Sequence, residues 1–421
     1  MTTSRFVASL IAVALAAASH TAHAAPDEIE LGKSDGYPFQ ALVPGFSFTN
    51  ERTKVGTFSN MEEIFSPRKI AASPASSPLP PHDGSPSLTY SYNGQSYSVD
   101  DFLNRQRITG LLILKDGKVV LERYQYDRKP EHRFASMSMA KTVVGLLVGV
   151  ALKEGKIASL DDAAEKYAPD LKGSAWGPMT LRNLLRMSSG LKWSDKVVAG
   201  GATDIGRLSS ETFFRRTGGG PSAITWVKDS VAPQGTTFNY SSAETFALAL
   251  ALRGAIGVDL ATYFSERIWK VIGAESDASW LTDWSGMESA FCCMNARLRD
   301  YGRLGLLLAN DGSWNGREVI PRDFLLDATD ATRQPDHLKP RRATQFFGYG
   351  YQTWIYPYTT RTFQARGLFG QEIIVQPESR IVVVMTSVSR TPETVSEVFV
   401  ERNYFVGAVL KALGGKADMY R

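Results

Sequence analysis

One apolar segment constrains the fold of this chain more than any other. It runs from Ser138 to Leu152, and Lys141 is its only charged residue. A helix that is apolar on most of its faces has to lie inside a protein, and Gly155 is well placed to end this one. We therefore expect a central buried helix that carries a lysine in its first turn.

Ser138 and Lys141 form a candidate nucleophile and base at the start of this helix. Residues three apart on a helix share a face, so the amine can reach the hydroxyl. The positive helix N-terminus and the apolar surroundings both disfavour the ammonium form, and a neutral amine can take the proton of a serine. A capping serine beside a snorkelling lysine would show the same spacing. Ser66–Lys69 also matches it, but Pro67 argues against a buried helix there.

The first residues have the pattern of an export signal. Arg5 precedes an apolar run from Phe6 to about Ala18, and Ala22–Ala24 is a small-x-small cleavage site. We expect a signal peptide over residues 1–24 and a secreted, periplasmic protein, with no stable membrane insertion after cleavage. An uncleaved anchor is the alternative, although the run is short for a bilayer.

Charge and cysteine content exclude other classes. The net charge of +4 includes Arg5, so the processed chain would carry +3, too little to suggest a nucleic-acid partner. Cys292 and Cys293 are the only cysteines, and adjacent cysteines rarely bond each other. We expect no disulfide framework and two small buried residues.

The histidines argue against two hydrolase mechanisms. Two of the five lie in the signal segment, and His82, His132 and His337 are widely scattered. No spacing resembles a zinc site, and no Gly-x-Ser-x-Gly elbow occurs. We expect neither a metal nor another cofactor. His132 precedes Ser138 by six residues, and we interpret it as a surface or capping residue rather than a base.

Turn signals divide the rest of the chain. Residues 25–89 are interpreted as an N-terminal extension with a Pro-rich extended connector over about 66–87, and residues 90–421 as the main domain. Hairpins are expected at Asn93-Gly94 and Asp116-Gly117. A mainly helical insertion is expected over about 160–290.

Later segments complete the expected fold. Ser241–Glu244 matches a capping box, and Asn295 is a candidate cap for a helix that contains Gly302 and Gly305. Alternating residues predict strands over about 362–387, and a last helix is expected over 396–413. Strands at both ends with helices between them indicate an α+β fold, an antiparallel sheet flanked by helices.

Five segments carry a resemblance to a known family. They are, in chain order, Ser138–Lys141, Thr180–Leu191, Gly235–Ser242, Ala296–Gly305 and Gly367–Gln371. In this order and spacing, residues 90 to 415 resemble the serine hydrolases of the penicillin-binding-protein and class C β-lactamase superfamily. The most similar branch is that of the 6-aminohexanoate-dimer hydrolase and related esterases.

The resemblance implies roles for particular residues. Ser138 would attack a carbonyl carbon, and Lys141 and Tyr240 would share the proton. The backbone N–H groups of Ser138 and Leu368 would form the oxyanion hole. The remaining substrate-binding candidates are Gly367, Gly370, Gln371 and Ser242. Outside the motifs, Tyr240 would be read as a loop aromatic and the two glycines as a plain turn.

Departures from the family pattern bear on the substrate. Ala365-Arg366-Gly367 stands where the β-lactamases have Lys-Thr-Gly, and we expect the Arg366 side chain to face away from the site. Phe369 replaces a histidine of the nylon-oligomer branch, and Ser242 replaces a common asparagine. Trp193, Asp195 and Trp354 are candidates for the pocket wall or, alternatively, for packing alone.

The expected function is hydrolysis of carboxylic esters or small amides, with small-molecule substrates, through a Ser-Lys-Tyr acyl-enzyme. One alternative is a D-alanyl-D-alanine carboxypeptidase or β-lactamase. Another is a non-catalytic relative that binds cell-envelope material. The sequence leaves open the oligomeric state and whether residues 25–65 pack on the core.

Overall fold

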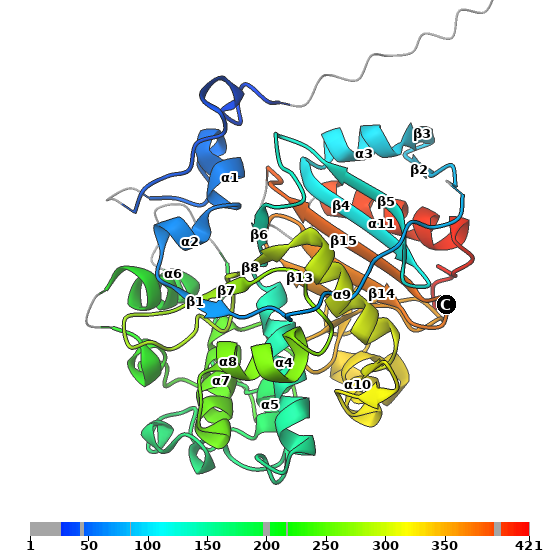
Figure 1. Cartoon of the computed structure of the whole chain (residues 1–421). Helices are drawn as coiled ribbons and strands as arrows, with labels where there is room; N and C mark the ends of the chain where they lie inside the picture. The colour runs from blue at the N-terminus through cyan, green and yellow to red at the C-terminus, as the bar shows by residue number, and fades with distance from the viewer. Residues whose placement is uncertain are drawn as a thin grey trace, which may run out of the picture.

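A seven-stranded antiparallel sheet forms the framework of the molecule (Figure 1), in the order β11-β12-β13-β14-β15-β4-β5. The computed structural model describes residues 27–42, 46–84, 86–196, 203–215, 218–390 and 397–420. The strands are β4 Ile108–Lys115, β5 Lys118–Tyr124, β11 Gly348–Tyr349, β12 Trp354–Ile355, β13 Phe363–Gly367, β14 Gln371–Gln376 and β15 Ile381–Ser387. Pairing of β15 with β4 joins distant parts of the chain. The expected α+β fold is confirmed.

Both predicted hairpins are present. Asn93 and Gly94 connect β2 (Thr89–Tyr92) to β3 (Gln95–Ser98), and Asp116-Gly117 connects β4 to β5. All four turn residues have positive φ, which is the conformation that a two-residue hairpin turn requires.

Alternate residues of the main sheet contribute to two separate cores. Ile113 and Val383 face α3 (Val99–Arg105) and α11 (Glu397–Ala412), while Leu112 and Val382 face the opposite side. On that side lie α4 (Met139–Lys153) and α9 (Leu298–Ala309). Successive strand residues point to opposite faces, so one sheet serves both layers.

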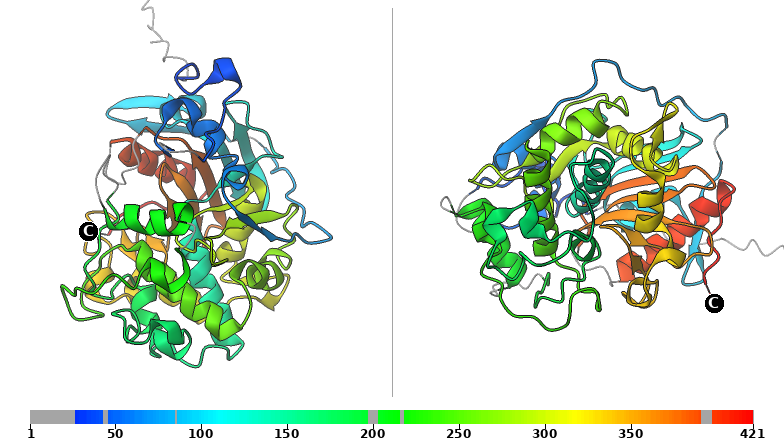
Figure 2. Two further views of the ribbon diagram at one scale, coloured as in Figure 1. Left: turned by 90° about the vertical axis from the view of Figure 1, so that its left-hand side faces the viewer. Right: turned by 90° about the horizontal axis from the view of Figure 1, so that it is seen from below.

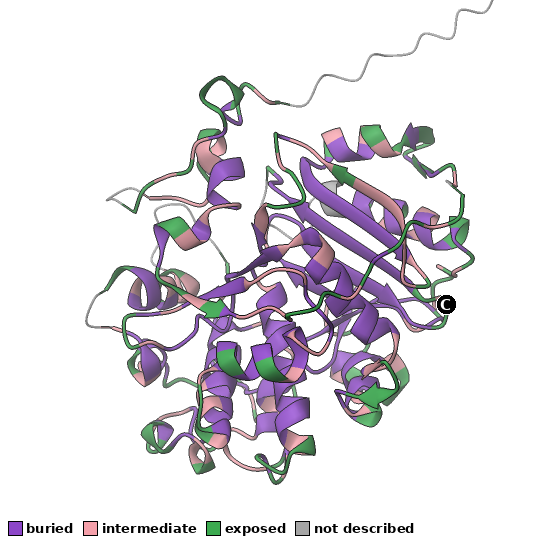
Figure 3. Cartoon of the chain, in the orientation of Figure 1, coloured by how far each residue is buried: buried purple, intermediate pink, exposed green. Residues whose placement is uncertain are grey.

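The buried helix expected from the sequence is α4. Residues Met139 to Ala151 are all buried, and Gly155 follows with φ +68°. Seen from below, α4 lies between the helical part in green and the main sheet in orange (Figure 2). Figure 3 shows α4 and the central strands as largely buried.

Two glycines bring α9 close to the main sheet. A Cβ on Gly302 would lie 2.7 Å from Leu112 Cδ2, and one on Gly305 would lie 2.4 Å from Val382 Cγ1. The expected close packing is confirmed, but the expected cap is not. Asn295 lies in strand β8 and donates to Ser279 Oγ, and the residue before α9 is Arg297.

The helical part lies below the sheet in Figure 1. Its helices are α5 Leu181–Leu185, α6 Asp204–Ser209, α7 Ser242–Ile256 and α8 Leu260–Phe264, with α10 Arg322–Thr329 nearby. Ser241 Oγ accepts the N–H of Glu244 at 3.3 Å, as expected of a cap, whereas the Glu244 carboxyl accepts from Ser189 instead. Short elements are η1 Lys33–Asp35, η2 Ala164–Lys166, η3 Pro169–Leu171, η4 Ser210–Phe214, η5 Gly220–Ala223, η6 Ser265–Trp269, η7 Ala331–Arg333, η8 Asp336–Leu338, β9 Ser313–Trp314 and β10 Arg317–Glu318.

A second sheet was not predicted. It has the order β1-β7-β8-β6, with β1 Pro67–Ile70, β6 Arg133–Ala135, β7 Ala278–Leu281 and β8 Met294–Arg297. The start of the segment interpreted as a connector is therefore strand β1, which pairs with β7 far along the chain. The Ser66–Lys69 copy of the motif lies on this strand and not on a helix, as expected.

The N-terminal extension packs on the main body. It contains α1 (Glu51–Thr57) and α2 (Met61–Ile64). The Phe58 carbonyl accepts the Ala135 N–H at 2.9 Å, next to the turn that carries Ser138. Arg107 of the main body binds Asp27, Glu30 and Glu51 of the extension. The question that the sequence left open is thereby answered for residues 27–42 and 46–65.

No single helix in the described part of the chain has the length and apolar character to cross a bilayer. Ser242–Ile256 and Leu260–Trp269 pass that test only as a pair, and they are bent by 73°.

Candidate active site

A strained turn presents Ser138. Strand β6 leads into Met137, whose φ of 44° is uncommon for a residue with a side chain. Two hydrogen bonds to Met294 hold Ser136, which directly precedes Met137. The Ser136 N–H donates to the Met294 carbonyl at 2.7 Å, and the Ser136 Oγ accepts the Met294 N–H at 3.0 Å. The second sheet thus holds the turn, and half-buried Ser138 lies directly before α4.

Lys141 lies within hydrogen-bonding distance of the Ser138 hydroxyl. Its Nζ is 3.0 Å from Ser138 Oγ, 3.0 Å from Ser242 Oγ and 2.9 Å from the Phe291 carbonyl oxygen. The residue is 1 % exposed. Burial lowers the pKa of the amine to about 8, although the Asp195 carboxylate opposes this. A sizeable neutral fraction therefore exists near pH 8.

Tyr240 completes the group around Ser138. Its ring packs against Trp354 with centroids 5.2 Å apart, and Lys141 Nζ lies over the same ring, 5.0 Å from its centroid. Burial raises the pKa of the phenol, and Asp195 raises it further, whereas Ser138 and Arg366 lower it. The phenol therefore keeps its proton at neutral pH, which suits a proton relay better than a standing phenolate.

The end of β13 passes close to the Ser138 backbone. A Cβ on Gly367 would lie 2.9 Å from the Ser138 nitrogen and 2.5 Å from the Ser136 carbonyl oxygen. Only glycine permits this approach, and half-buried Leu368 follows directly. Gly370 has φ +88°, and its Cβ would overlap the Arg402 guanidinium, so it also requires glycine.

Two residues of the Gly367–Gln371 segment contact protein rather than the space beside Ser138. Gln371 is 1 % exposed, and its amide donates to the carbonyls of Ser387 at 2.6 Å and Leu368 at 3.2 Å. Phe369 is buried against Phe58 of the extension. Gln371 thus holds the loop that carries Leu368.

Arg366 faces away from α4, as expected for its place on the strand. Its Nε lies 3.5 Å from Glu372 Oε1, and its guanidinium lies over the Phe347 ring at 5.0 Å. Its charge still acts on the phenol of Tyr240.

Asp195 and Trp193, candidates for the pocket wall, belong to a polar network behind Lys141. Ser242 Oγ donates to Asp195 Oδ2 at 2.7 Å, and the Ser242 N–H donates to Asp195 Oδ1 at 3.1 Å. The Trp193 indole N–H also donates to Asp195. In the sequence, the only signal for Asp195 was its position shortly after the Ser188-Ser189-Gly190-Leu191 run. Its hydrogen bonds to Ser242 were therefore not predicted.

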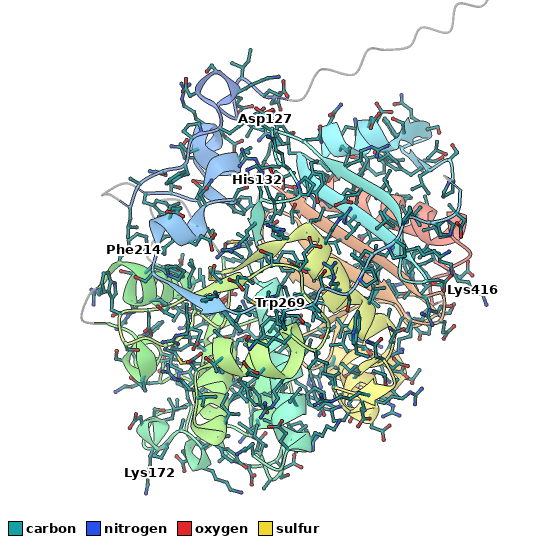
Figure 4. All side chains as sticks on the ribbon, in the orientation of Figure 1. Asp127, His132, Lys172, Phe214, Trp269 and Lys416 are labelled. Atoms are coloured by element: carbon teal, nitrogen blue, oxygen red, sulfur yellow. A yellow bond between two sulfur atoms is a disulfide. The ribbon has the colours of Figure 1, made fainter. Side chains whose placement is uncertain are left out.

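His132 has a structural role, and no metal site is found around it in the part of the chain that the structure describes. The ring of His132, labelled in Figure 4, accepts the Lys129 N–H at 2.8 Å, which fits the predicted capping role. Within the described residues, no group of three or more His, Cys, Asp or Glu could hold a metal ion.

Family comparison agrees with this geometry. The Beta-lactamase family model matches residues 98–399. The chain belongs to the beta-lactamase family. It is a hydrolase of the penicillin-binding-protein-like fold.

Individual relatives point to the same branch. The 6-aminohexanoate-dimer hydrolase of Paenarthrobacter ureafaciens is 24% identical over 288 residues, which cover 67% of this chain and 73% of that protein. A Bacillus anthracis protein provisionally assigned as a 6-aminohexanoate-dimer hydrolase has a TM-score of 0.79 at 22% identity, covering 89% and 97% of the two chains. EstCE1, a hydrolase with promiscuous acyltransferase activity, has a TM-score of 0.58 at 17% identity, covering 75% and 96%.

The two cysteines of this beta-lactamase-family chain differ from what the sequence led us to expect. Cys292 and Cys293 form a disulfide with each other, so the expectation that these neighbours would stay unbonded is wrong. The left-handed backbone at Cys293, with φ of 76°, turns the chain at this point. Both residues are buried, as expected, and they directly follow Phe291, whose carbonyl accepts from Lys141.

Proposed function

We propose that this protein is a secreted serine hydrolase that cleaves carboxylic esters or small amides through an acyl-enzyme on Ser138. The observation that carries the proposal is the contact of 3.0 Å between Ser138 Oγ and the buried Lys141 amine. Burial lowers the pKa of that amine to about 8, so it can act as a base.

In the acylation step, Ser138 Oγ bonds to the substrate carbonyl carbon and its proton passes to Lys141. The carbonyl electron pair moves onto oxygen, where the N–H groups of Ser138 and Leu368 would stabilise it. When the pair returns, the bond to the leaving alcohol or amine breaks. The leaving group takes a proton from Tyr240, which regains one from Lys141.

Water then attacks the acyl-enzyme. One water proton passes to the Lys141 and Tyr240 pair, the ester bond to Ser138 breaks, and Ser138 regains its proton. The net reaction adds one water and yields a carboxylic acid with an alcohol or amine. This relay is supported by the 3.0 Å between Lys141 Nζ and Ser138 Oγ and by the position of the same amine over the Tyr240 ring, 5.0 Å from its centroid.

The proposed substrate class follows from the relatives and from two residues of β13. The relative from Paenarthrobacter ureafaciens is named a 6-aminohexanoate-dimer hydrolase, and the fold of EstCE1 belongs to a hydrolase with promiscuous acyltransferase activity. Ala365 stands at the position of the lysine of the β-lactamases, and Arg366 is engaged with Glu372. We therefore favour linear esters and amides over β-lactams.

Two features support the proposed export. Residues 1–24 have the sequence pattern of a signal peptide, and a disulfide is typical of an oxidising compartment. Fractionation of cells that express the full chain tests this: activity in the periplasm and a mature protein starting at Ala25 are expected.

The test of function compares wild type with Ser138→Ala. Wild type should hydrolyse p-nitrophenyl esters and be labelled by a fluorophosphonate, and the variant should do neither. Equal turnover by both proteins would refute Ser138 as the nucleophile. A panel of short and long acyl esters, a 6-aminohexanoate dimer and a cephalosporin then assigns the class. Stable labelling by penicillin would favour a carboxypeptidase, and peptidoglycan binding without labelling would favour a non-catalytic protein.

A further inference from the structure

A continuous chain of hydrogen bonds connects Ser138 to a carboxylate. Ser138 Oγ and Ser242 Oγ each lie 3.0 Å from Lys141 Nζ, and Ser242 Oγ lies 2.7 Å from Asp195 Oδ2. Two hydrogen bonds thus separate the buried amine from the carboxylate. The Ser138-Lys141-Tyr240 mechanism alone gives this second half of the chain no role.

Asp195 determines the direction of the hydrogen bond between Ser242 and Lys141. A carboxylate only accepts, so the single proton of the Ser242 hydroxyl points toward Asp195. The oxygen of Ser242 then offers only lone pairs to Lys141. The Phe291 carbonyl, 2.9 Å from the same amine, also only accepts. Two N–H bonds of Lys141 are therefore directed at Ser242 and Phe291.

The remaining position on the amine faces Ser138. A neutral amine has two N–H bonds and one lone pair in a tetrahedral arrangement. With both N–H bonds occupied by acceptors, the lone pair is left toward Ser138 Oγ at 3.0 Å. We propose that Asp195 is a positioning residue that acts through Ser242 to direct the lone pair of Lys141 at the nucleophile. This inference rests on the proposed function of the site.

The same network suits the amine after proton transfer. As Ser138 Oγ bonds to the carbonyl carbon, its proton moves to Nζ and the amine becomes an ammonium with three N–H bonds. Ser242, Phe291 and Ser138 then accept one bond each. No side chain has to reorient during the transfer, which keeps the cost of reorganisation low.

Asp195 is itself firmly held. Its oxygens accept the Ser242 N–H and the Trp193 indole N–H in addition to the Ser242 hydroxyl. The Trp193 carbonyl accepts from the Asn239 amide at 3.1 Å, directly before Tyr240. The carboxylate therefore stays in place when the substrate changes, as a positioning group must.

The other charged and titratable groups near this hydrogen-bond chain lie on or before α7 and on two strands of the main sheet. Tyr240, before α7, keeps its proton because burial raises its pKa. The carboxyl group of Glu244 on α7 accepts a hydrogen bond from Ser189. Burial raises the pKa of this carboxyl to about 8, so it is mostly neutral at pH 7. Tyr349 on β11 has a raised pKa through burial, and Arg366 on β13 acts on Tyr240. Asp195 is the charged group that acts on Lys141 among the described residues.

Replacing Asp195 by asparagine has two separable consequences. Loss of the negative charge disfavours the ammonium, so the pKa of Lys141 falls and the neutral base persists to lower pH. An asparagine can also donate to Ser242, which frees the hydroxyl to donate to the lone pair of Lys141 and to compete with Ser138. The acidic limb of the pH profile should move down while the plateau rate falls.

The experiment measures kcat/KM for a p-nitrophenyl ester between pH 5 and 10. For Asp195→Asn we expect the acidic midpoint to fall by about one pH unit, because the variant removes a charge about two hydrogen bonds from the Lys141 amine. The plateau of kcat/KM should drop about tenfold. Ser242→Ala keeps the carboxylate but removes the link, so its plateau should fall similarly with a smaller shift of the midpoint. Both variants should also be labelled by the fluorophosphonate more slowly than wild type.

Asp204→Asn is the matched control. Asp204 accepts the Ser194 N–H at 2.9 Å and supports the same loop without contacting Ser242. Its profile should overlay that of wild type. The inference is overturned if Asp195→Asn and Ser242→Ala match wild type, or if Asp204→Asn shifts the midpoint equally. Ser138→Ala separates the two proposals: if it retains full turnover, the function itself is wrong, whereas an inactive Ser138→Ala beside a normal Asp195→Asn refutes only the positioning role.

Discussion

Gly367→Ala tests whether the end of β13 forms one side of the oxyanion hole. The added Cβ would lie 2.5 Å from the Ser136 carbonyl oxygen and 2.9 Å from the Ser138 nitrogen, where ordinary contact begins at 3.4 Å. These are backbone atoms and cannot rotate away. The strand end and the Ser138 turn therefore have to separate by roughly 1 Å, by the same contact criterion.

A separation of that size removes one oxyanion hydrogen bond. A donor at about 2.9 Å would move to about 3.9 Å, beyond hydrogen-bonding distance. Loss of one such donor costs about 10² to 10³ in kcat, or about 3 kcal/mol in the transition state. We expect kcat for a p-nitrophenyl ester to fall by that factor while KM changes little, because the interaction strengthens only as charge develops on oxygen.

The control is Gly254→Ala near the end of α7. There the Cβ would lie 1.9 Å from the Tyr167 carbonyl oxygen, so the variant meets a backbone clash of at least equal severity. It should lower the melting temperature without changing kcat of the folded protein. The reasoning is refuted if folded Gly367→Ala keeps wild-type kcat, or if Gly254→Ala loses activity to the same degree.

Three further predictions concern the same site. Because burial lowers the pKa of Lys141 to about 8 and the neutral amine is the active form, kcat/KM of wild type should rise with pH and level off above an apparent midpoint near 8; a flat profile from pH 6 to 9 would contradict this. Tyr240→Phe should lose about 10²-fold to 10⁴-fold on an alkyl ester or amide but less on a p-nitrophenyl ester, whose leaving group needs no proton. The folded protein should show no free thiol with a disulfide-exchange dye, and two after denaturation with a reductant; alkylation of the folded, untreated protein would refute the pairing of Cys292 and Cys293.

Elements with local signals could be predicted from the sequence. Asn-Gly and Asp-Gly turns determine their own backbone conformation, and both hairpins formed as expected. Helix α4 was predictable because its apolar character leaves it no exposed face. Ser138 and Lys141 follow from the same helix, since a spacing of three residues alone brings their side chains together.

The second sheet shows where local signals end. Strands β1 and β7 lie about 200 residues apart in the chain, and β1 begins with a proline in a segment that is otherwise typical of a connector. Its stability comes from partners, not from its own residues. The same applies to Asp195, whose role depends on a hydroxyl that lies 47 positions away.

The surroundings of Ser138 also depend on partners that are distant in sequence, in the segment that contains the disulfide and in the N-terminal extension. Two separate segments support the surroundings of Ser138. In one, the Phe291 carbonyl accepts from Lys141 and Met294 holds Ser136; in the other, Phe58 packs on Phe369. Phe58 lies outside the matched residues 98–399, yet it contacts the loop that carries Leu368. The motifs include Ser138 and the residues nearest to it, whereas the loop that carries Leu368 is also held by a segment that the motifs do not include.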